Sequence, residues 1–540
     1  MKKTLYTLLS TGLFLALGAC ETQKEADLLV INAKVYTVDK SFSTQESFAV
    51  KDGKFIAVGT NEELQKSYRA NEVIDAKNAA VYPGFIDGHC HFYGLGLQQQ
   101  KVDLVGTQSY QEVLDRLVAF QKEKQVPFIT GRGWDQNDWE VKEFPTKTKL
   151  DELFPETPVA IRRIDGHAML VNQAAINLAG IDINTRIDGG EFLIKDGALT
   201  GVLIDNAMNF IKVPKPSKKE QIQALLDAQK ICFDLGLTTV DDAGLDREVI
   251  ELVDSLQHAG SLKMRIYAMI SNTEKNLDYY LNKGIIKTDR LHVRSVKVYA
   301  DGALGSRGAA LKDAYADKKG HFGALVNSYD NLQSLAKRIA ASEYQMNTHA
   351  IGDSANYVML KTYHQVLPTE NDRRWRIEHA QIVDVKDFKL FKNVLPSIQP
   401  THATSDMYWA EDRVGSERIH GAYAYNDLLK EYGKVALGTD FPIENVSPLY
   451  TFYAATIRKD LKGYPAEGYQ TNNALSRENA LKGMTIWNAY GNFEETEKGS
   501  IEVGKLADFI ILENDIMTVE GNKIPHTKVN HTYVNGERVN

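Results

Sequence analysis

Cysteine is scarce in this 540-residue chain, which contains only Cys20, Cys90 and Cys232. So few cysteines cannot form the disulfide framework on which many exported proteins depend, so the fold does not rest on disulfides. Blocks of lysine and arginine are also absent, and the formal net charge is −8. The chain therefore lacks the electrostatic footprint of a nucleic-acid-binding protein, and we expect no nucleic-acid partner.

Residues 1–20 have the pattern of a lipoprotein signal peptide. They begin with the basic sequence MKK, continue with an apolar stretch too short to span a membrane, and end in LGAC, which resembles the lipobox of bacterial lipoproteins. On this interpretation Cys20 is lipidated, residues 21–26 form a tether, and lipid alone anchors the protein to a membrane. We expect it in the cell envelope, on the periplasmic or surface face of an outer membrane or at the surface of a single-membrane bacterium. A secretory peptide cleaved elsewhere is the alternative.

The rest of the chain divides into a small β-sheet domain built from both ends and a large β/α unit between them. SFAVKDGKFIAVG near the start and HTYVNGERV near the end alternate like strands and contain Asp-Gly and Asn-Gly hairpin turns. Between them, apolar runs alternate with helical stretches such as YQEVLDRLVAFQKE, which is typical of parallel β/α architecture. The length fits an eight-fold barrel with an insertion at about residues 131–217. We therefore predict the α/β fold class.

A histidine pair, two further histidines, a lysine and an aspartate follow the apolar runs. His89 and His91 in GFIDGHCHF are two residues apart at a strand end, so they project from one face and can bind one ion together. The others are Lys297 in VKVYADG, His349 in NTHAIGD, His379 in RIEHAQ and Asp440 in LGTDFP. Because the strand ends of a barrel meet at one mouth, we expect these six residues, the ligand set, to bind one or two divalent metal ions.

Each member of the ligand set has a structural alternative when it is considered alone. Histidines are often satisfied within a core, a strand lysine is usually solvated, and an aspartate such as Asp440 favours helix N-caps and turns. Cys90 lies between the two paired histidines, and strand alternation turns it to the opposite face, where we expect a packing residue. The order of the whole set along the chain is what predicts a metal site.

The motifs PGFIDGHCH, VKVYADGALGSR, HAIGD, RIEHAQ, SIQPTH and GTDFP, followed by GKLADFIIL, resemble those of the amidohydrolase superfamily. Within it the chain is similar to amidohydrolase family 3, which includes N-substituted formamide deformylases. The resemblance covers nearly the whole chain after the signal segment. It implies a TIM-like (β/α)8 barrel over residues 83–492 with a metal centre at its mouth. It also implies a β-sandwich made of residues 27–82 and 493–540.

The resemblance also implies roles for the ligand set. Burial lowers the pKa of a lysine amine, and the neutral amine of Lys297 would add carbon dioxide to give a carbamate that bridges two cations. Zinc suits the imidazole and carboxylate ligands, and iron, manganese and nickel are alternatives. Asp440 would be both a ligand and the general base, which accepts a proton from the attacking metal-bound hydroxide and then protonates the departing nitrogen.

These roles predict a hydrolase that cleaves a carbon–nitrogen bond other than a peptide bond. The expected substrate is a small molecule, an N-acyl or N-formyl amine. A lactone or ester hydrolase would use the same metal centre and is an alternative, as is a lipoprotein that binds a ligand without converting it. The sequence leaves the oligomeric state open.

Six residues on predicted loops near the mouth are candidates for the substrate pocket. They are Trp134 in RGWD, His167 in RIDGHAMLVN, Asp301 and Arg307 in ADGALGSR, Asp353 in HAIGD and His402 in QPTH. Arg307 suits a substrate carboxylate, which it would bind through two hydrogen bonds, and a salt bridge to Asp301 is the alternative. Trp134 has loop packing as its alternative, and the insertion that carries it could shape the pocket or form a structural cap.

Overall fold

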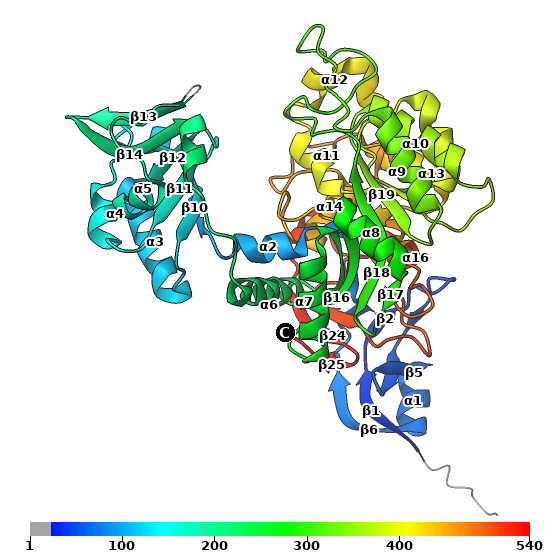
Figure 1. Cartoon of the computed structure of the whole chain (residues 1–540). Helices are drawn as coiled ribbons and strands as arrows, with labels where there is room; N and C mark the ends of the chain where they lie inside the picture. The colour runs from blue at the N-terminus through cyan, green and yellow to red at the C-terminus, as the bar shows by residue number, and fades with distance from the viewer. Residues whose placement is uncertain (1–22, 188–189) are drawn as a thin grey trace, which may run out of the picture.

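The computed structural model describes residues 23–187 and 190–540. The predicted signal segment with Cys20 and the start of the tether lie outside the described residues. Within the described ranges, no helix is both long and apolar enough to cross a membrane. The chain forms a β-sandwich, a barrel and an insertion domain, with the sandwich below the barrel and the insertion domain to its left in Figure 1.

Two sheets form the sandwich. One has the order β5-β4-β1-β6, and the other, β25-β24-β23-β7-β2-β3, joins strands from both ends of the chain. The strands are β1 (Lys24–Ile31), β2 (Lys34–Tyr36), β3 (Thr44–Gln45), β4 (Ser47–Lys51), β5 (Lys54–Gly59), β6 (Tyr68–Asp75), β7 (Ala80–Pro83), β23 (Phe509–Leu512), β24 (Val529–Val534) and β25 (Glu537–Arg538). Asp52-Gly53 and Asn535-Gly536 turn the two hairpins with positive φ at all four residues, as a type I′ turn requires.

Parallel strands in sequence order form the barrel, which confirms the predicted TIM-like fold. They are β8 (Phe85–Cys90), β15 (Leu237–Leu245), β16 (Arg265–Ser271), β18 (Leu291–Tyr299), β19 (Gln345–Ala350), β20 (Arg376–His379), β21 (Leu395–Ile398) and β22 (Ala436–Leu437). The ring closes just beyond β22, where the N–H of Asp440 donates to the carbonyl of His89 and the N–H of His91 donates to the carbonyl of Phe441, both at 2.8 Å. This closure brings the first and last parts of the ligand set together.

Asp87 and Gly438 make this closure possible. The Asp87 carboxylate accepts hydrogen bonds from the N–H of Thr439 at 3.0 Å and its hydroxyl at 2.7 Å, and from the N–H of His89 at 3.2 Å. Burial raises the pKa of Asp87 to about 7, and these hydrogen bonds oppose the shift. Gly438 lies so close to β8 that a Cβ there would stand 2.5 Å from the backbone nitrogen of His89. Only glycine allows the two segments to approach this far.

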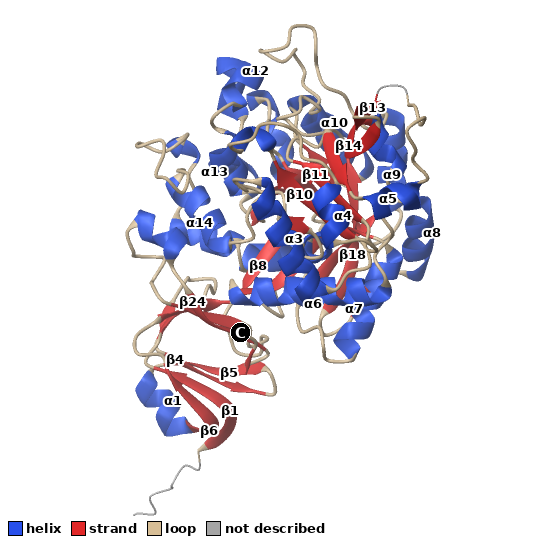
Figure 2. Cartoon of the chain, turned by 90° about the vertical axis from the view of Figure 1, so that its left-hand side faces the viewer, coloured by secondary structure: helices blue, strands red, loops and turns tan. Residues whose placement is uncertain are grey.

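Helices lie around the barrel strands (Figure 2). They are α6 (Lys218–Asp234), α7 (Arg247–His258), α8 (Glu274–Lys283), α9 (Tyr329–Ala340), α10 (Asp353–Val366), α13 (Tyr425–Tyr432), α15 (Arg477–Gly483) and α16 (Ile486–Gly491), with α2 (Phe92–Gln98), α11 (Pro400–Asp406), α12 (Ala410–Arg418) and α14 (Pro448–Ile457) beside them. In α9, for example, Leu332, Ala336 and Ile339 recur at helical spacing and are buried. Ser217 and Glu220 form a capping box that begins α6.

The insertion domain begins earlier than residue 131. Its sheet, in the order β13-β14-β12-β11-β10-β9, starts at β9 (Val102–Asp103), and the domain ends near a 3-10 helix at Asn206–Phe210. The other elements are α3 (Tyr110–Lys124), β10 (Ile129–Trp134), α4 (Thr148–Leu153), β11 (Val159–Arg163), β12 (Ala168–Val171), α5 (Gln173–Ala179), β13 (Gly190–Lys195) and β14 (Ala198–Asp205). The helical stretch YQEVLDRLVAFQKE is α3, and it packs on β9 and β10 rather than on the barrel. Periodicity shows which face of a helix is buried but not which sheet covers it.

Candidate metal centre

The ends of β8 and β18 and the segment after β22 bring four members of the ligand set into contact. The Lys297 Nζ atom lies 2.9 Å from Nε2 of His89. The Oδ1 atom of Asp440 lies 3.2 Å from Nε2 of His91 and 3.6 Å from Nε2 of His89. His89 and Lys297 are buried, whereas His91 is partly exposed at the mouth. The side chains meet although up to 351 positions separate them along the chain, from His89 to Asp440.

His349 at the end of β19 and His379 at the end of β20 complete the group. Their ring centroids lie 4.5 Å apart, and the ring of His379 lies 5.0 Å from that of His89. His379 has a φ of 73°, in the left-handed region that residues with a Cβ rarely adopt. This conformation interrupts the strand alternation just where the side chain meets the other histidines. All six members of the ligand set therefore gather at one end of the barrel.

Several buried ligand atoms of this group have no hydrogen-bond partner among residues 23–187 and 190–540. They are Nε2 of His349, Nδ1 of His379 and Oδ1 of Asp440. Because buried polar atoms are normally paired, three unpaired nitrogen and oxygen atoms in one site fit a cation as their common partner. The donor set of imidazole and carboxylate groups also matches what zinc and similar divalent ions prefer.

Within the part of the chain that the structure describes, two groups of ligand atoms are compact enough to hold a metal ion, and they share Asp440. One consists of His89, His91 and Asp440, and the other of His379, His402 and Asp440, with the ligand atoms of each group within 4.8 Å of one another. The second group includes His402, which is not a member of the ligand set, and it does not include His349, which is. Nε2 of His349 faces Oδ1 of Asp301 at 3.7 Å instead.

Burial dominates the electrostatics of the group. It lowers the pKa of His89 and Lys297, and it lowers that of His349 to about 3. It also lowers the pKa of His379 far below the ordinary value, so these histidines are neutral, as metal ligands must be. Burial alone would raise the pKa of Asp440, but its contacts with His402 and the other neighbouring histidines outweigh burial, and the pKa lies well below its usual range.

His402, a candidate for the substrate pocket, lies beside Asp440. It follows β21 in the first turn of α11, and its Nε2 atom lies 3.3 Å from Oδ2 of Asp440. Its Nδ1 atom lies 3.4 Å from Oε1 of Glu444, which accepts a hydrogen bond from the hydroxyl of Ser405 at 2.6 Å. Burial opposes the protonation of this ring, but the two carboxylates outweigh it and raise the pKa of His402 to about 10. Each ring nitrogen of His402 thus faces a carboxylate oxygen.

Glu378 is a further residue of the site, and its place in the motif RIEHAQ did not reveal it. It is buried, and its Oε2 atom lies 2.6 Å from Nδ1 of His89. Burial alone would raise the pKa of Glu378, but His89, Arg376 and Lys297 together outweigh it and lower the pKa, so the carboxylate accepts there. The proton of His89 is thus on Nδ1, and the lone pair of Nε2 faces Lys297 and Asp440. Because neighbouring residues on a strand point to opposite faces, the position of Glu378 beside His379 did not mark it as part of the site.

Asp301 and Asp353, two candidates for the substrate pocket, are buried and bind backbone groups of the protein. Asp301 is 2% exposed, and its carboxylate accepts hydrogen bonds from the N–H groups of Ala310, Ile351 and Gly352. Asp353 is buried at the start of α10 and accepts from the N–H of Lys312 at 2.8 Å. Both carboxylates accept hydrogen bonds from the backbone of neighbouring loops, which accounts for their burial without a substrate.

Arg307 forms a salt bridge, but with Asp317 instead of Asp301. Its Nε and NH2 atoms lie 3.0 and 2.8 Å from the two carboxylate oxygens of Asp317, which also binds Arg413. The guanidinium is therefore already engaged by two parallel hydrogen bonds, the geometry that the sequence analysis assigned to a substrate carboxylate.

Trp134 and His167 belong to the insertion domain and lie away from the mouth. Trp134 is fully buried in the core of that domain, where it packs against apolar residues, and its Nε1 atom donates to the carbonyl of Ile161 at 3.0 Å. His167 is exposed, and its Nδ1 atom lies 2.7 Å from Oδ1 of Asp205.

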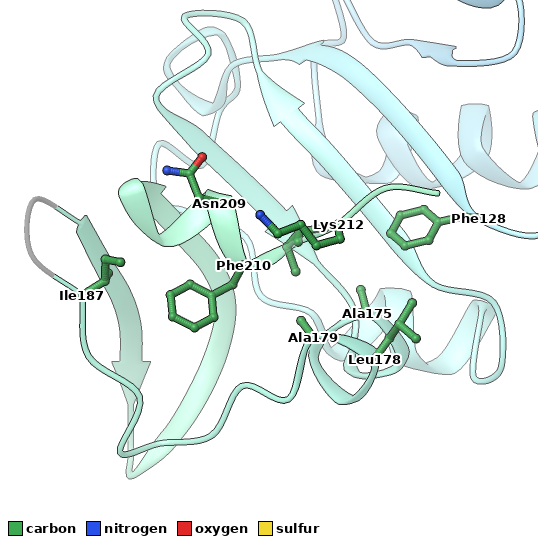
Figure 3. A pocket seen from close by; sticks show the side chains of 9 residues that line it. Phe128, Ala175, Leu178, Ala179, Ile187, Asn209, Phe210 and Lys212 are labelled. Atoms are coloured by element: carbon green, nitrogen blue, oxygen red, sulfur yellow. The ribbon is translucent and has the colours of Figure 1, made fainter. Parts of the chain in front are cut away.

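The insertion domain also has an open apolar hollow (Figure 3), lined by Phe128, Leu178, Phe210 and their neighbours. Lys212 is the one titratable residue among those that line it, so the hollow lacks the groups for hydrolysis.

A (β/α)8 barrel whose strand ends bring together neutral histidines, a lysine and an ionised aspartate defines a metal-dependent barrel hydrolase. The amidohydrolase family profile matches residues 72–540, and the chain belongs to that family. It is accordingly a hydrolase that acts on carbon–nitrogen bonds other than peptide bonds. The predicted family resemblance is confirmed.

Individual relatives match over almost the whole chain. The putative amidohydrolase YtcJ of Bacillus subtilis is 31% identical over 521 residues, which cover 94% of this chain and 98% of the relative. The N-substituted formamide deformylase of Arthrobacter pascens is 25% identical, with coverage of 94% and 97%. Among solved structures, an uncharacterised metal-dependent hydrolase from Pyrococcus horikoshii is 28% identical with a TM-score of 0.76, covering 92% of this chain and 99% of that one.

Replacing Glu378 should weaken metal binding without unfolding the protein. Glu378→Ala removes the acceptor that holds the proton of His89 on Nδ1, and loss of such a partner typically lowers metal affinity about 10- to 100-fold. Competition titration of metal-free protein with Zn²⁺ measures this effect. Glu378→Gln is the matched control, since its amide oxygen still accepts from Nδ1 and should retain most of the affinity. Wild-type affinity in Glu378→Ala would show that this contact does not orient His89.

Proposed function

We propose that this protein hydrolyses an N-acyl or N-formyl amine with the help of one or two divalent cations, zinc in the first instance, held by the ligand set. The observation that carries the proposal is the buried contact of His89, His91, Lys297 and Asp440 at the barrel mouth. The similarity to a protein named N-substituted formamide deformylase supports the choice of bond. The partly exposed ring of His91 leaves one side of the site open to a small molecule.

The residues divide the work as follows. A bound divalent cation supplies an activated water and polarises the substrate carbonyl. Asp440 takes the proton from the attacking water on Oδ1, the oxygen that lies near His91 and makes no hydrogen bond within the described residues. The same carboxyl group then delivers the proton to the departing nitrogen, so that the amine leaves in neutral form. The neutral histidines hold the cation, and Glu378 keeps the ring of His89 in the required tautomer.

Removal of metal should abolish hydrolysis. We expect the purified protein to contain one or two transition-metal ions per chain, and chelator treatment followed by dialysis should eliminate activity that added Zn²⁺ then restores. The assay uses a panel of N-formyl amines, N-acyl amines, cyclic amides and lactones. Turnover confined to lactones would replace the proposed substrate class by the ester alternative, and full activity of metal-free protein would refute the proposal.

Lys297 is proposed to carry a carbamate that would bridge two bound cations. Its amine is buried beside His89, and burial lowers its pKa, which favours the neutral form that adds carbon dioxide. Lys297→Ala should lose activity at least about 100-fold, the scale of loss for a group that acts on the reacting centre. Small carboxylates such as acetate or propionate should restore part of it by occupying the vacated space.

The control for this experiment is Lys230→Ala, which removes an exposed lysine paired with Asp234 on α6 and should leave activity unchanged. Wild-type activity in Lys297→Ala would exclude a role for the lysine. Recovery by chloride as effective as recovery by carboxylates would point to a simple charge effect instead of a bridging carboxylate.

We also propose that lipid on Cys20 anchors the protein to the cell envelope. The basis is the LGAC sequence after a short apolar stretch. Cells grown with labelled palmitate should yield labelled protein, and Cys20→Ala should yield unlabelled protein that is released from the membrane fraction. Cys232→Ala, which removes a buried free thiol, is the matched control and should keep the label. Label that persists in Cys20→Ala would disprove the anchor.

A further inference from the structure

Asp440 has two oxygens in different surroundings. Oδ1 faces Nε2 of His91 and of His89, at 3.2 and 3.6 Å, and has no hydrogen-bond partner within the described residues. Oδ2 accepts from Nε2 of His402 at 3.3 Å. The backbone of Asp440 is itself held in the left-handed region with a φ of 63°. The main chain therefore determines where this carboxylate lies. The contact of His402 with Oδ2 determines how the carboxylate group is rotated.

His402 is in turn held on its other side. Nδ1 lies 3.4 Å from Oε1 of Glu444, and the hydroxyl of Ser405, one turn along α11, donates to the same oxygen at 2.6 Å. The three side chains are nearly covered, with 14% of His402, 8% of Asp440 and 20% of Glu444 exposed. A short chain of contacts thus runs from Ser405 through Glu444 and His402 to Oδ2 of Asp440.

We propose that His402, held by Glu444, is a positioning residue for Asp440. By binding Oδ2 it prevents the carboxylate from turning both oxygens toward the histidine pair, and it leaves Oδ1 as the oxygen that receives the proton. The inference rests on the proposed function of Asp440 as the proton-transfer group. On this proposal His402, the histidine of QPTH, and Glu444 orient Asp440 and bind neither the substrate nor the metal.

The competing assignment is that His402 is a metal ligand, because its Nε2 atom is near enough to His379 and Asp440 for that role. The contact between Nε2 and Oδ2 of Asp440 at 3.3 Å argues against it, because an imidazole that coordinates a cation through Nε2 cannot also donate from Nε2. The contact of Nδ1 with Glu444 does not separate the two assignments, since a metal-ligating histidine also commonly donates its other N–H to a carboxylate. Metal content distinguishes the two assignments directly.

The test compares His402→Ala, His402→Asn and Glu444→Gln in the metal-loaded enzyme, each alone and combined with Asp440→Asn. Asp440→Asn alone should lower kcat by about 100- to 10,000-fold. His402→Ala should lower kcat about 10- to 100-fold, the usual cost of an outer-shell partner, with KM and bound metal per chain unchanged. His402→Asn should recover part of the loss, since its amide N–H can donate to Oδ2, and Glu444→Gln should cost less than His402→Ala.

The decisive result is the combination, because groups that act through one another are not additive. In the Asp440→Asn background, His402→Ala should cause no further fall in kcat. A further fall equal to that in the wild-type background, loss of bound metal, or unchanged kcat in His402→Ala would each overturn the positioning role. Wild-type activity in Asp440→Asn would instead overturn the proposed function of Asp440.

His258→Ala is the matched control. His258 lies 3.3 Å from Asp254, the same separation as between His402 and Asp440, but on the outer helix α7. Its removal should leave kcat, KM and metal content at wild-type values.

Discussion

The closure of the barrel between β8 and the segment after β22 is the constraint on which the site depends. Two main-chain hydrogen bonds join His89 to Asp440 and His91 to Phe441, so the histidine pair and the aspartate are fixed by the same contacts that complete the ring. Asp87 and Gly438 serve this junction, one by hydrogen bonding and the other by having no Cβ. The chemistry of the site and the stability of the barrel are therefore not separable at this point.

The site is buried and contains ionised carboxylates, whose negative charge a bound cation would balance. Burial drives His89, His349 and His379 to the neutral form, whereas the neighbouring groups keep Asp440 and Glu378 ionised. An ionised carboxylate in a water-poor site is costly unless an opposite charge compensates it. His402 compensates one oxygen of Asp440, and the other oxygen faces the place where a metal ion would lie. Burial explains both the neutral ligands and the need for a cation.

The sequence revealed the elements that have a short-range signature. Asp-Gly and Asn-Gly turns identified the hairpins, and apolar runs ending in His89, His349 and His379 identified strands of the barrel. It did not reveal where the insertion begins, because α3 has the same amphipathic pattern whether it covers the barrel or the sheet of the insertion domain. Sequence proximity to a site motif also did not reveal that the carboxylates of Asp301 and Asp353 accept hydrogen bonds from backbone N–H groups.

The sequence by itself determined the fold class, the family and the six residues that meet at the mouth, because strand order in a barrel converts order along the chain into position around one ring. Only the tertiary structure decided what each of them touches. Glu378 reaches His89 across the barrel interior, His402 reaches Asp440 from the neighbouring strand end, and Trp134 is enclosed in a separate core. Such contacts depend on the direction of a side chain and on its burial, which are set by main-chain angles such as the positive φ of His379 and of Asp440. Residue type and spacing do not encode those angles.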